Sequence, residues 1–302
     1  MIELNNADNF ITCSAKTHRI KIQRIPFTTS KDERKSILMC HIGKKWVSLP
    51  YLSIGVMETK PTDIDSAPFQ IFESEEGNYI STSRQDWEIR DTVAHSQYIY
   101  SQKVFPTIKL NYENLWNCFS SNVKRKIRKA QKNGIEIIFG KDKSFVKRFH
   151  RVYSQRMAEL GTFSFPKKAI QRRANAGYSI IFLALKDGIV IGGATLTDYM
   201  NGTFVNELFA TSKDYNKYYT SYLLHYAMMC YAQENKAKYY SLGRCTKNSS
   251  LHKYKKHWQG EDITLFWSFS KKQRNIREYN FHKHLPKRLI RWASPWLSKW
   301  IY

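Results

Sequence analysis

Hydrophobic residues in the second half of the chain recur at helical and then at strand spacing, and each change of period marks an element boundary. Helical spacing predicts helices between Ser121 and Asn133 and at 145–160, 166–176 and 218–235. Apolar runs predict strands at 135–139, 178–185, 190–199, 203–210 and 239–242. The pairs Asp187-Gly188 and Asn201-Gly202 predict hairpin turns that join the three middle strands into an antiparallel meander. Such an order predicts an α/β (α+β) domain.

Residues before Leu115 show strand patterns and little helical periodicity. Strands are predicted at 19–26, 46–51 and 87–90, and a turn at 43–45 precedes the second of them. Residues 61–77 are rich in Asp, Ser, Pro and Glu, which indicates an exposed connection. We therefore expect the first part of the chain to be mostly β.

The segment Tyr239–Gly260 joins a short strand, a polar loop and a short helix. The strand ends at Leu242-Gly243-Arg244, and the helix at 251–258 carries aromatic and cationic side chains together. Because cationic groups on a short helix attract negative charge, this order predicts a site for an anionic ligand.

The predicted helix that begins near Ser121 is strongly basic. Its narrow apolar stripe consists of Val123, Ile127 and Ala130. The positions between carry cations, namely Lys124, Arg125, Lys126, Arg128, Lys129 and Lys132. These cations could follow the phosphates of RNA or of a nucleotide diphosphate. The alternative is a solvated helix face without a partner.

The formal net charge is +24, and its distribution is uneven. Residues 1–100 have 12 Lys and Arg against 13 Asp and Glu, whereas residues 101–302 have 37 against 12. An asymmetric positive field attracts nucleic acid, nucleotide-linked substrates or an acidic membrane face. The alternative is a basic surface that only favours solubility.

The last residues, 285–302, form a separate basic and amphipathic segment. Its apolar positions 285, 289, 292, 293, 296 and 300 fall on one helical face, and three of them are Trp. This pattern suits the headgroup layer of an anionic membrane, although Pro295 should kink the helix. Alternatively, the segment docks its Trp face on the rest of the protein.

Several classes of protein are disfavoured by the residues present. The five Cys are scattered without metal-ligand or redox spacing, as expected of reduced cytosolic thiols. The nine His form no set of metal ligands, so no metal is predicted. With no apolar run of spanning length and a polar N-terminus, we expect a cytoplasmic protein, with peripheral attachment to the inner membrane face as a further option.

The stretch Tyr254-Lys255-Lys256-His257-Trp258, followed by Gln259 and Gly260, resembles a signature of FemAB-type peptidoglycan-bridge aminoacyltransferases, which are related to acyltransferases of the GNAT superfamily. The order of helices and strands after residue 134 is similar to the GNAT fold. The basic helix ending in Lys132-Asn133-Gly134, and the phrases at 47–51 and 88–91, also match the FemAB type.

This resemblance implies two GNAT-like lobes, with a mixed central sheet flanked by helices and a reduced first lobe. The expected boundaries are 1–110 for the first lobe, 111–134 for the basic connecting helix, 135–270 for the acyltransferase lobe, and 271–302 for the basic amphipathic tail.

Acyl transfer to an amine needs a route for the amine proton and positive charge near the developing oxyanion. Lys255 matches the Lys of the family signature, which implies oxyanion or phosphate stabilisation; the alternative is an ordinary surface Lys. Glu207 is a candidate general base; the alternative is that its carboxylate pairs with a nearby Lys or Arg. Asp198 is a weaker candidate for the same role. The expected substrate-binding residues are Arg244, Tyr254, Trp258, Arg90 and Tyr215.

The loop at 211–220 contains no glycine, although GNAT enzymes usually bind the coenzyme A pyrophosphate there through a glycine-rich turn. The donor is therefore expected to be aminoacyl-tRNA or acyl-coenzyme A, with no tightly bound cofactor. We predict an N-acyltransferase acting on an amine of a cell-wall or envelope precursor, which would be linked to a lipid or a nucleotide. The alternatives are an acyl-coenzyme A-dependent GNAT enzyme and a non-catalytic RNA- or membrane-binding protein.

Overall fold

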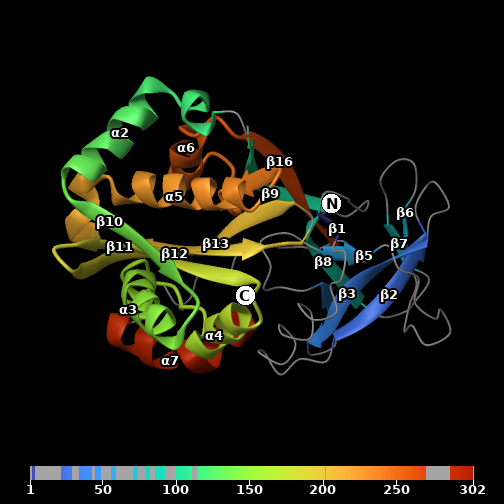
Figure 1. Ribbon diagram of the computed structural model, residues 1–302. Helices are drawn as coiled ribbons and strands as arrows, with labels where there is room; N and C mark the ends of the chain where they lie inside the picture. Colours follow the sequence, from blue (N-terminus) through green and yellow to red (C-terminus); the bar gives the residue numbers. More distant parts are fainter. Residues whose placement is uncertain are drawn as a thin grey trace. The chain divides into compact units, whose positions relative to one another are not determined.

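The computed structural model describes residues 2–3, 22–28, 34–42, 45–48, 56–58, 71–73, 79–81, 86–92, 99–110, 114–200, 202–269 and 286–301 (Figure 1). The chain forms two compact units, each assembled from separate stretches. The first unit comprises Met1–Pro106, Arg244–His252 and Asp262–Arg277. The second unit comprises Thr107–Gly243, Lys253–Glu261 and Glu278–Tyr302, and it contains the candidate site.

The second unit has a mixed sheet at its centre, as predicted. The strands lie in the order β10 (Ile135–Gly140), β11 (Ser179–Lys186), β12 (Ile189–Asp198), β13 (Thr203–Thr211), β14 (Tyr239–Ser241) and the end of β9 (Ile99–Lys109). All neighbours are antiparallel except β13 and β14, which are parallel. The meander β11–β12–β13 confirms the three predicted strands.

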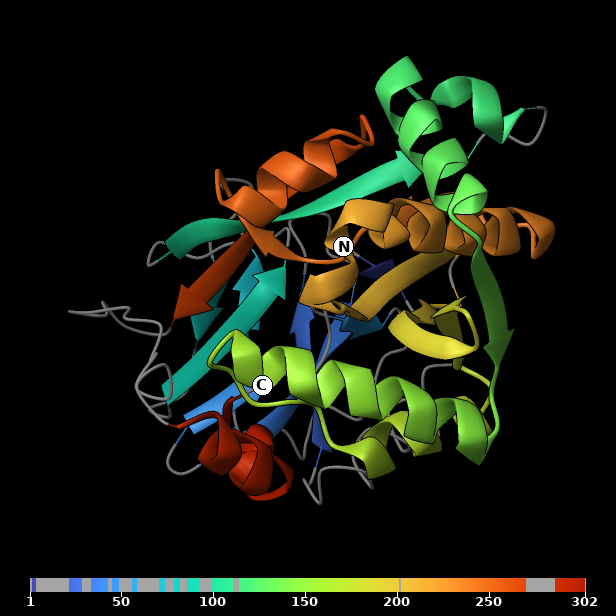
Figure 2. The same cartoon turned by 90° about the vertical axis from the view of Figure 1, so that its left-hand side faces the viewer.

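Helices cover both faces of this sheet, as Figures 1 and 2 show. One face carries α2 (Ser121–Lys132) and α5 (Thr220–Glu234), and the other carries α3 (Lys143–Glu159), α4 (Lys167–Asn175) and α7 (Lys287–Ile301). The apolar side chains of α5 fill the space between α2 and the sheet, where Leu224, Met228 and Met229 are fully buried. Short 3-10 helices lie at Leu115–Cys118 (η2) and Lys213–Tyr218 (η3).

The local signals read from the sequence explain where these elements begin and end. The Ser120 hydroxyl caps α2 by accepting a hydrogen bond from the Val123 N–H, and the stripe of Val123, Ile127 and Ala130 is buried. Asp187 and Gly188 both have positive φ, as a tight hairpin of two residues requires. At the second predicted turn, Tyr199 N–H donates to the Thr203 carbonyl, while Asn201 lies outside the described residues.

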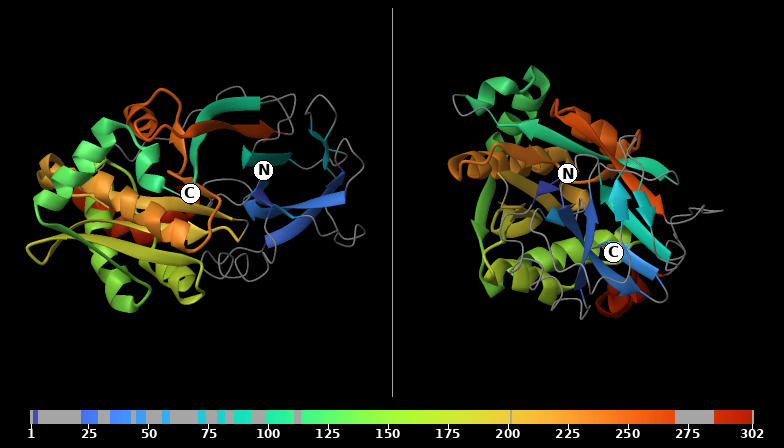
Figure 3. Two further views of the ribbon diagram at one scale, coloured as in Figure 1. Left: turned by 45° about the horizontal axis from the view of Figure 1, so that its top comes forward. Right: turned by 90° about the vertical axis from the view of Figure 1, so that its right-hand side faces the viewer.

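The described residues of the first unit are almost entirely strands (Figure 3). They are β1 (Ile2–Glu3), β2 (Ile22–Thr28), β3 (Arg34–Ile42), β4 (Lys45–Ser48), β5 (Val56–Glu58), β6 (Ile71–Glu73), β7 (Tyr79–Ser81), β8 (Asp86–Thr92), the start of β9, β15 (Cys245–Thr246) and most of β16 (Glu261–Phe269). The expectation of a mostly β first part is confirmed for these residues. One strand, β6, lies inside the stretch expected to be an exposed connection. A reduced GNAT-like lobe in this part of the chain stays a prediction.

The C-terminal helix α7 packs on the second unit through a narrow edge. Ile290 is buried in a small cluster with Ala158 and Phe163. The Ser294 hydroxyl accepts a hydrogen bond from the Ser164 N–H at 3.1 Å and donates to the Ile290 carbonyl at 2.7 Å. Trp292, one residue of the predicted Trp face, is 73% exposed and takes no part in this packing, while the side chains of Trp296 and Trp300 lie outside the described residues. Among the described residues, no helix combines the length and apolarity needed to cross a membrane.

Candidate functional site

The parallel strands β13 and β14 are hydrogen-bonded over a short stretch and then separate. Their pairing joins Thr203–Val205 to Tyr239–Ser241, and β13 then continues to Thr211 paired with β12 and no longer with β14. Where the pairing ends, Gly243 has a φ of +77°, and a Cβ at this position would lie 2.3 Å from the Asn206 carbonyl oxygen. Only glycine fits such a close approach of two backbones in this conformation. Gly243 therefore positions the chain at the point where the two strands separate.

Lys255 lies at this point, contributed by the short helix α6 (Ser250–Lys256). Its side chain is only 5% exposed, and its ammonium donates a hydrogen bond of 2.7 Å to the Gly243 carbonyl oxygen. A buried ammonium is costly unless polar groups surround it. The alternative of an ordinary surface Lys is therefore wrong, while the predicted role in oxyanion stabilisation stays a prediction.

Tyr254 and Trp258 flank Lys255 in the sequence and belong to one buried cluster of aromatic rings. Trp258 is stacked on Tyr222 with ring centroids 5.6 Å apart and meets Phe119 edge-on at 5.4 Å. Tyr254 meets Tyr222 edge-on at 5.3 Å. The Tyr254 hydroxyl and the Trp258 indole N–H are buried, and neither has a well-oriented hydrogen-bond partner in the described part of the chain. These two predicted substrate-binding residues thus pack against the aromatic side chains of Tyr222 and Phe119.

His225 on α5 completes this environment and was not identified from the sequence. Its ring is stacked on Phe209 with centroids 4.6 Å apart, and its Nδ1 lies 2.7 Å from the Tyr240 hydroxyl oxygen. Burial, and secondarily the charge of Lys255, lower the pKa of His225 to about 3. His225 is therefore a neutral imidazole beside a cation. Nothing in its isolated position within a Tyr-rich helix distinguishes it from the other His residues.

Side chains of α2, α5 and the residue after α6 are joined by a chain of hydrogen bonds. The Lys126 ammonium donates to the Tyr222 hydroxyl oxygen at 2.9 Å, and this hydroxyl lies 2.9 Å from Nδ1 of His257. Partial burial, and secondarily the Lys126 charge, lower the pKa of His257. The basic helix is thereby connected to the chain that carries Lys255 and Trp258.

The other predicted phosphate-binding cations also lie on α2. Lys129 is 5.2 Å from the centre of the Tyr219 ring, and Arg128 is 5.3 Å from that of Trp116. Arg125 donates to the Asn122 side chain, and Lys124 is half-buried. Within the described residues, none of these cations is paired with a carboxylate. The positive charge of this helix is thus not neutralised by the protein there.

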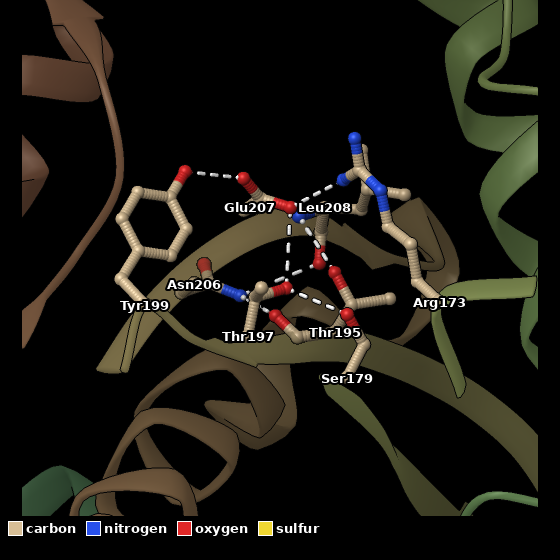
Figure 4. A network of polar contacts seen from close by, with 8 residues as sticks. All are labelled: Arg173, Ser179, Thr195, Thr197, Tyr199, Asn206, Glu207 and Leu208. Carbon is tan, nitrogen blue, oxygen red and sulfur yellow. Dashed lines mark hydrogen bonds and ion pairs between the residues drawn. The ribbon is translucent and has the colours of Figure 1, made fainter. Parts of the chain in front are cut away.

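Glu207 lies at a β-bulge of β13, because Asn206 and Leu208 pair with β12 and Glu207 does not. Its carboxylate accepts from Arg173 at 2.6 Å, from the Tyr199 hydroxyl at 2.5 Å and from the Thr197 hydroxyl at 3.1 Å. Figure 4 shows Arg173 and Tyr199 approaching the carboxylate from opposite sides. The side chains of Glu207 and Arg173 are each 4% exposed. The structure thus shows the ion pair considered as an alternative, while the general-base role stays a prediction.

The remaining candidates belong to four different elements or loops of the fold. Asp198 ends β12 and accepts a hydrogen bond from the Met200 N–H, and burial raises its pKa despite this bond. Tyr215 lies in η3, where its ring is 5.9 Å from that of Tyr218. Arg244 is half-buried directly after Gly243. Arg90 belongs to β8, but its side chain lies outside the described residues.

Known proteins resemble this chain in sequence over one region and in fold over most of its length. Residues 119–256 match the family model of the acetyltransferase (GNAT) domain. The crystal structure of FemX is similar, with a TM-score of 0.59 and 14% identity, over 87% of this chain and 92% of that one. The structure of L-PGS from Bacillus licheniformis has a TM-score of 0.54 and 12% identity, over 88% and 89%.

At these identities the two structures establish a shared fold and no more. No curated protein matches the sequence. The match to the domain family covers α2, the meander, α5 and Lys255, and it agrees with the mixed sheet and its flanking helices. The chain is therefore an acyltransferase that carries a GNAT-fold domain at residues 119–256.

Proposed function

We propose that this acyltransferase moves an aminoacyl group from tRNA onto an amine of a cell-wall or envelope precursor, as FemAB-type enzymes do. The single observation that carries the proposal is the buried Lys255 ammonium, fixed by the Gly243 carbonyl where β13 and β14 separate. The structural similarity to FemX and L-PGS supports the same choice at the level of the fold.

The proposed reaction is direct attack of the acceptor amine on the ester carbonyl of the donor. A carbon–nitrogen bond forms, the carbon–oxygen bond of the ester breaks, and the proton lost by the amine ends on the leaving oxygen. Lys255 would stabilise the negative charge that develops on the carbonyl oxygen. Its hydrogen bond to the Gly243 carbonyl orients the ammonium. Glu207, already bonded to Arg173, would serve mainly to hold β13 in place.

The entry to α5 favours aminoacyl-tRNA over acyl-coenzyme A. The loop that precedes this helix is folded into η3 and has no glycine, and Tyr219 caps the helix with a φ of +57°. Each residue there carries a side chain that would crowd a bound pyrophosphate. The unneutralised cations of α2 instead suit an extended phosphate backbone.

Acyl-coenzyme A is the second candidate donor, and the domain family itself favours it, since that family is described as acetyltransferases. Purified protein should be offered charged tRNAs and acyl-coenzyme A thioesters in parallel, with an amine-bearing muropeptide as acceptor. We expect deacylation of charged tRNA that depends on the acceptor. Consumption of the thioester alone would overturn the proposed donor.

The role of Lys255 is tested by Lys255→Met, which preserves the length of the side chain and removes its charge. We expect kcat to fall by about 10²- to 10³-fold, the cost of losing one oxyanion donor. Lys256→Met is the matched control, because this neighbour is exposed. Circular dichroism and thermal unfolding establish that both variants are folded. Equal rates for folded Lys255→Met and the unmodified protein would refute the assignment.

A further inference from the structure

The helix α7 packs on the rest of the second unit by one side, and its other side is exposed to solvent. The buried positions are Ile290 and Ser294, with Ala293 partly covered. Leu289 and Trp292 lie on a different side of the helix and are 49% and 73% exposed. Among the large apolar side chains of the described residues, none is more exposed than Trp292. Leu289 and Trp292 thus form the exposed apolar part of α7.

The exposed charges of α7 are all positive, which favours an anionic partner for this surface. Lys287, Arg288 and Arg291 are exposed, and the helix sequence contains no Asp or Glu. No ion pair neutralises these three cations within the described residues. Trp296 and Trp300 follow Trp292 at intervals of four residues in the same helix. The exposed Trp292 on a helix with exposed cations matches the interface of a bilayer that contains anionic lipid.

A buried hydrogen bond fixes the rotation of α7 about its own axis. The bond from the Ser164 N–H to the Ser294 hydroxyl is buried, so rotating the helix about its axis would break it and leave polar groups unpaired. Leu289 and Trp292 are thereby kept outward.

We propose that the outer edge of α7, formed by Leu289, Trp292 and the cations Lys287, Arg288 and Arg291, docks the protein on anionic phospholipid headgroups. The Trp side chain enters the interfacial layer, and the cations approach lipid phosphates. This proposal does not depend on the identity of the acyl donor or on Lys255, because none of these residues belongs to the candidate site.

Vesicle sedimentation tests the proposal with the full-length protein. We expect it to bind vesicles of phosphatidylcholine mixed with phosphatidylglycerol, and to bind pure phosphatidylcholine vesicles far less. Trp292→Ala should weaken binding to the anionic vesicles about tenfold or more. Arg288→Gln should weaken it about fivefold at low salt and less at high salt. Ile189→Ala is the matched control, since Ile189 is an apolar residue that is 58% exposed on a strand.

Three results would overturn the proposal. The unmodified protein could fail to bind anionic vesicles, or the Trp292→Ala protein could bind them as tightly as the unmodified one. Alternatively, light scattering without lipid could show a dimer that Trp292→Ala separates, which would make this edge an interface between two copies. Because Trp292 is exposed, its substitution should leave the thermal midpoint and the transfer activity toward a water-soluble acceptor unchanged.

Discussion

The Lys255 ammonium and the Gly243 carbonyl oxygen lie 2.7 Å apart, so a cation from one element is fixed by the backbone of another. Gly243 achieves this by adopting a positive φ directly against the Asn206 carbonyl. The position of the candidate catalytic charge therefore depends on a residue that has no side chain. Loss of either member should disturb the other.

Gly243→Ala should destabilise the protein and displace Lys255. The added Cβ would lie 2.3 Å from a backbone oxygen, which neither backbone can relieve without moving. We expect a loss of more than about 2 kcal/mol in the free energy of unfolding, measured by urea titration. Gly188→Ala is the matched control, because its φ is +76° and no atom lies within 4 Å. It should cost only about 1 kcal/mol; equal losses would contradict the prediction.

Breaking the ion pair of Arg173 and Glu207 should strongly lower the free energy of unfolding, because both side chains are buried. Glu207→Gln leaves the guanidinium without its counter-charge and should cost about 3–5 kcal/mol of unfolding free energy. The double variant with Arg173→Met should lose less than the sum of the single losses. The partly exposed pair of Arg156 and Glu159 is the comparison. There, Glu159→Gln should lower the free energy of unfolding by less than about 1 kcal/mol.

The same Glu207→Gln protein separates the two roles considered for this carboxylate. A purely structural role predicts that loss of activity follows loss of folded protein, as measured by circular dichroism at the assay temperature. A general base predicts that protein which remains folded loses kcat, with a changed pH–rate profile. A folded variant with intact stability and no activity would contradict the structural role.

The stability of the protein should fall in acid because of His225. Its pKa is lowered to about 3 in the folded state, whereas the unfolded chain protonates near the ordinary value of 6.5. The unfolded state therefore binds the extra proton first, and stability is lost as the pH falls from about 6.5 towards 3. The loss contributed by this group should approach about 1.4 kcal/mol per pH unit. Urea titrations at several pH values measure it.

His225→Gln is the comparison for this measurement. Glutamine cannot titrate but can still hydrogen-bond to the Tyr240 hydroxyl, so the variant should show a shallower decline below pH 6.5. His150, whose pKa burial also lowers, is present in both proteins and cancels in the difference. Parallel stability curves for the two proteins would show that His225 is not the group responsible.

If α2 binds the phosphates of tRNA, neutralising its cations should weaken binding and also its dependence on salt. Replacing Lys124 and Arg125 by Gln should reduce the slope of log K against log salt by about 2, since each phosphate contact contributes about 1. Fluorescence anisotropy with labelled tRNA measures this slope. Replacing Lys147 and Arg151 of α3 by Gln changes the net charge equally, and should leave the slope nearly unchanged. Identical slopes for both double variants would contradict a role for α2.

The elements of the second unit were predictable because their signals are local. Apolar spacing located α2, α3, α5 and the meander, and Asp187-Gly188 identified a turn whose backbone needs positive φ. In the first unit, strands such as β6 were missed, because a short strand in a polar segment depends on its neighbours rather than on its own pattern.

The sequence by itself determined the order of helices and strands in the second unit and the basic character of α2, since these depend on residue types and spacing along the chain. Lys255 was identified through the resemblance of residues 254–258 to a family signature. Only the tertiary structure decided that Lys255 is buried, that Glu207 is paired with Arg173, that neutral His225 lies beside the cation, and that α7 docks by Ile290 and Ser294 with Trp292 outward. The bonds of Lys255 to Gly243, of Arg173 to Glu207 and of Ser164 to Ser294 join residues 12, 34 and 130 positions apart. Periodicity along one segment holds no information about such distant partners.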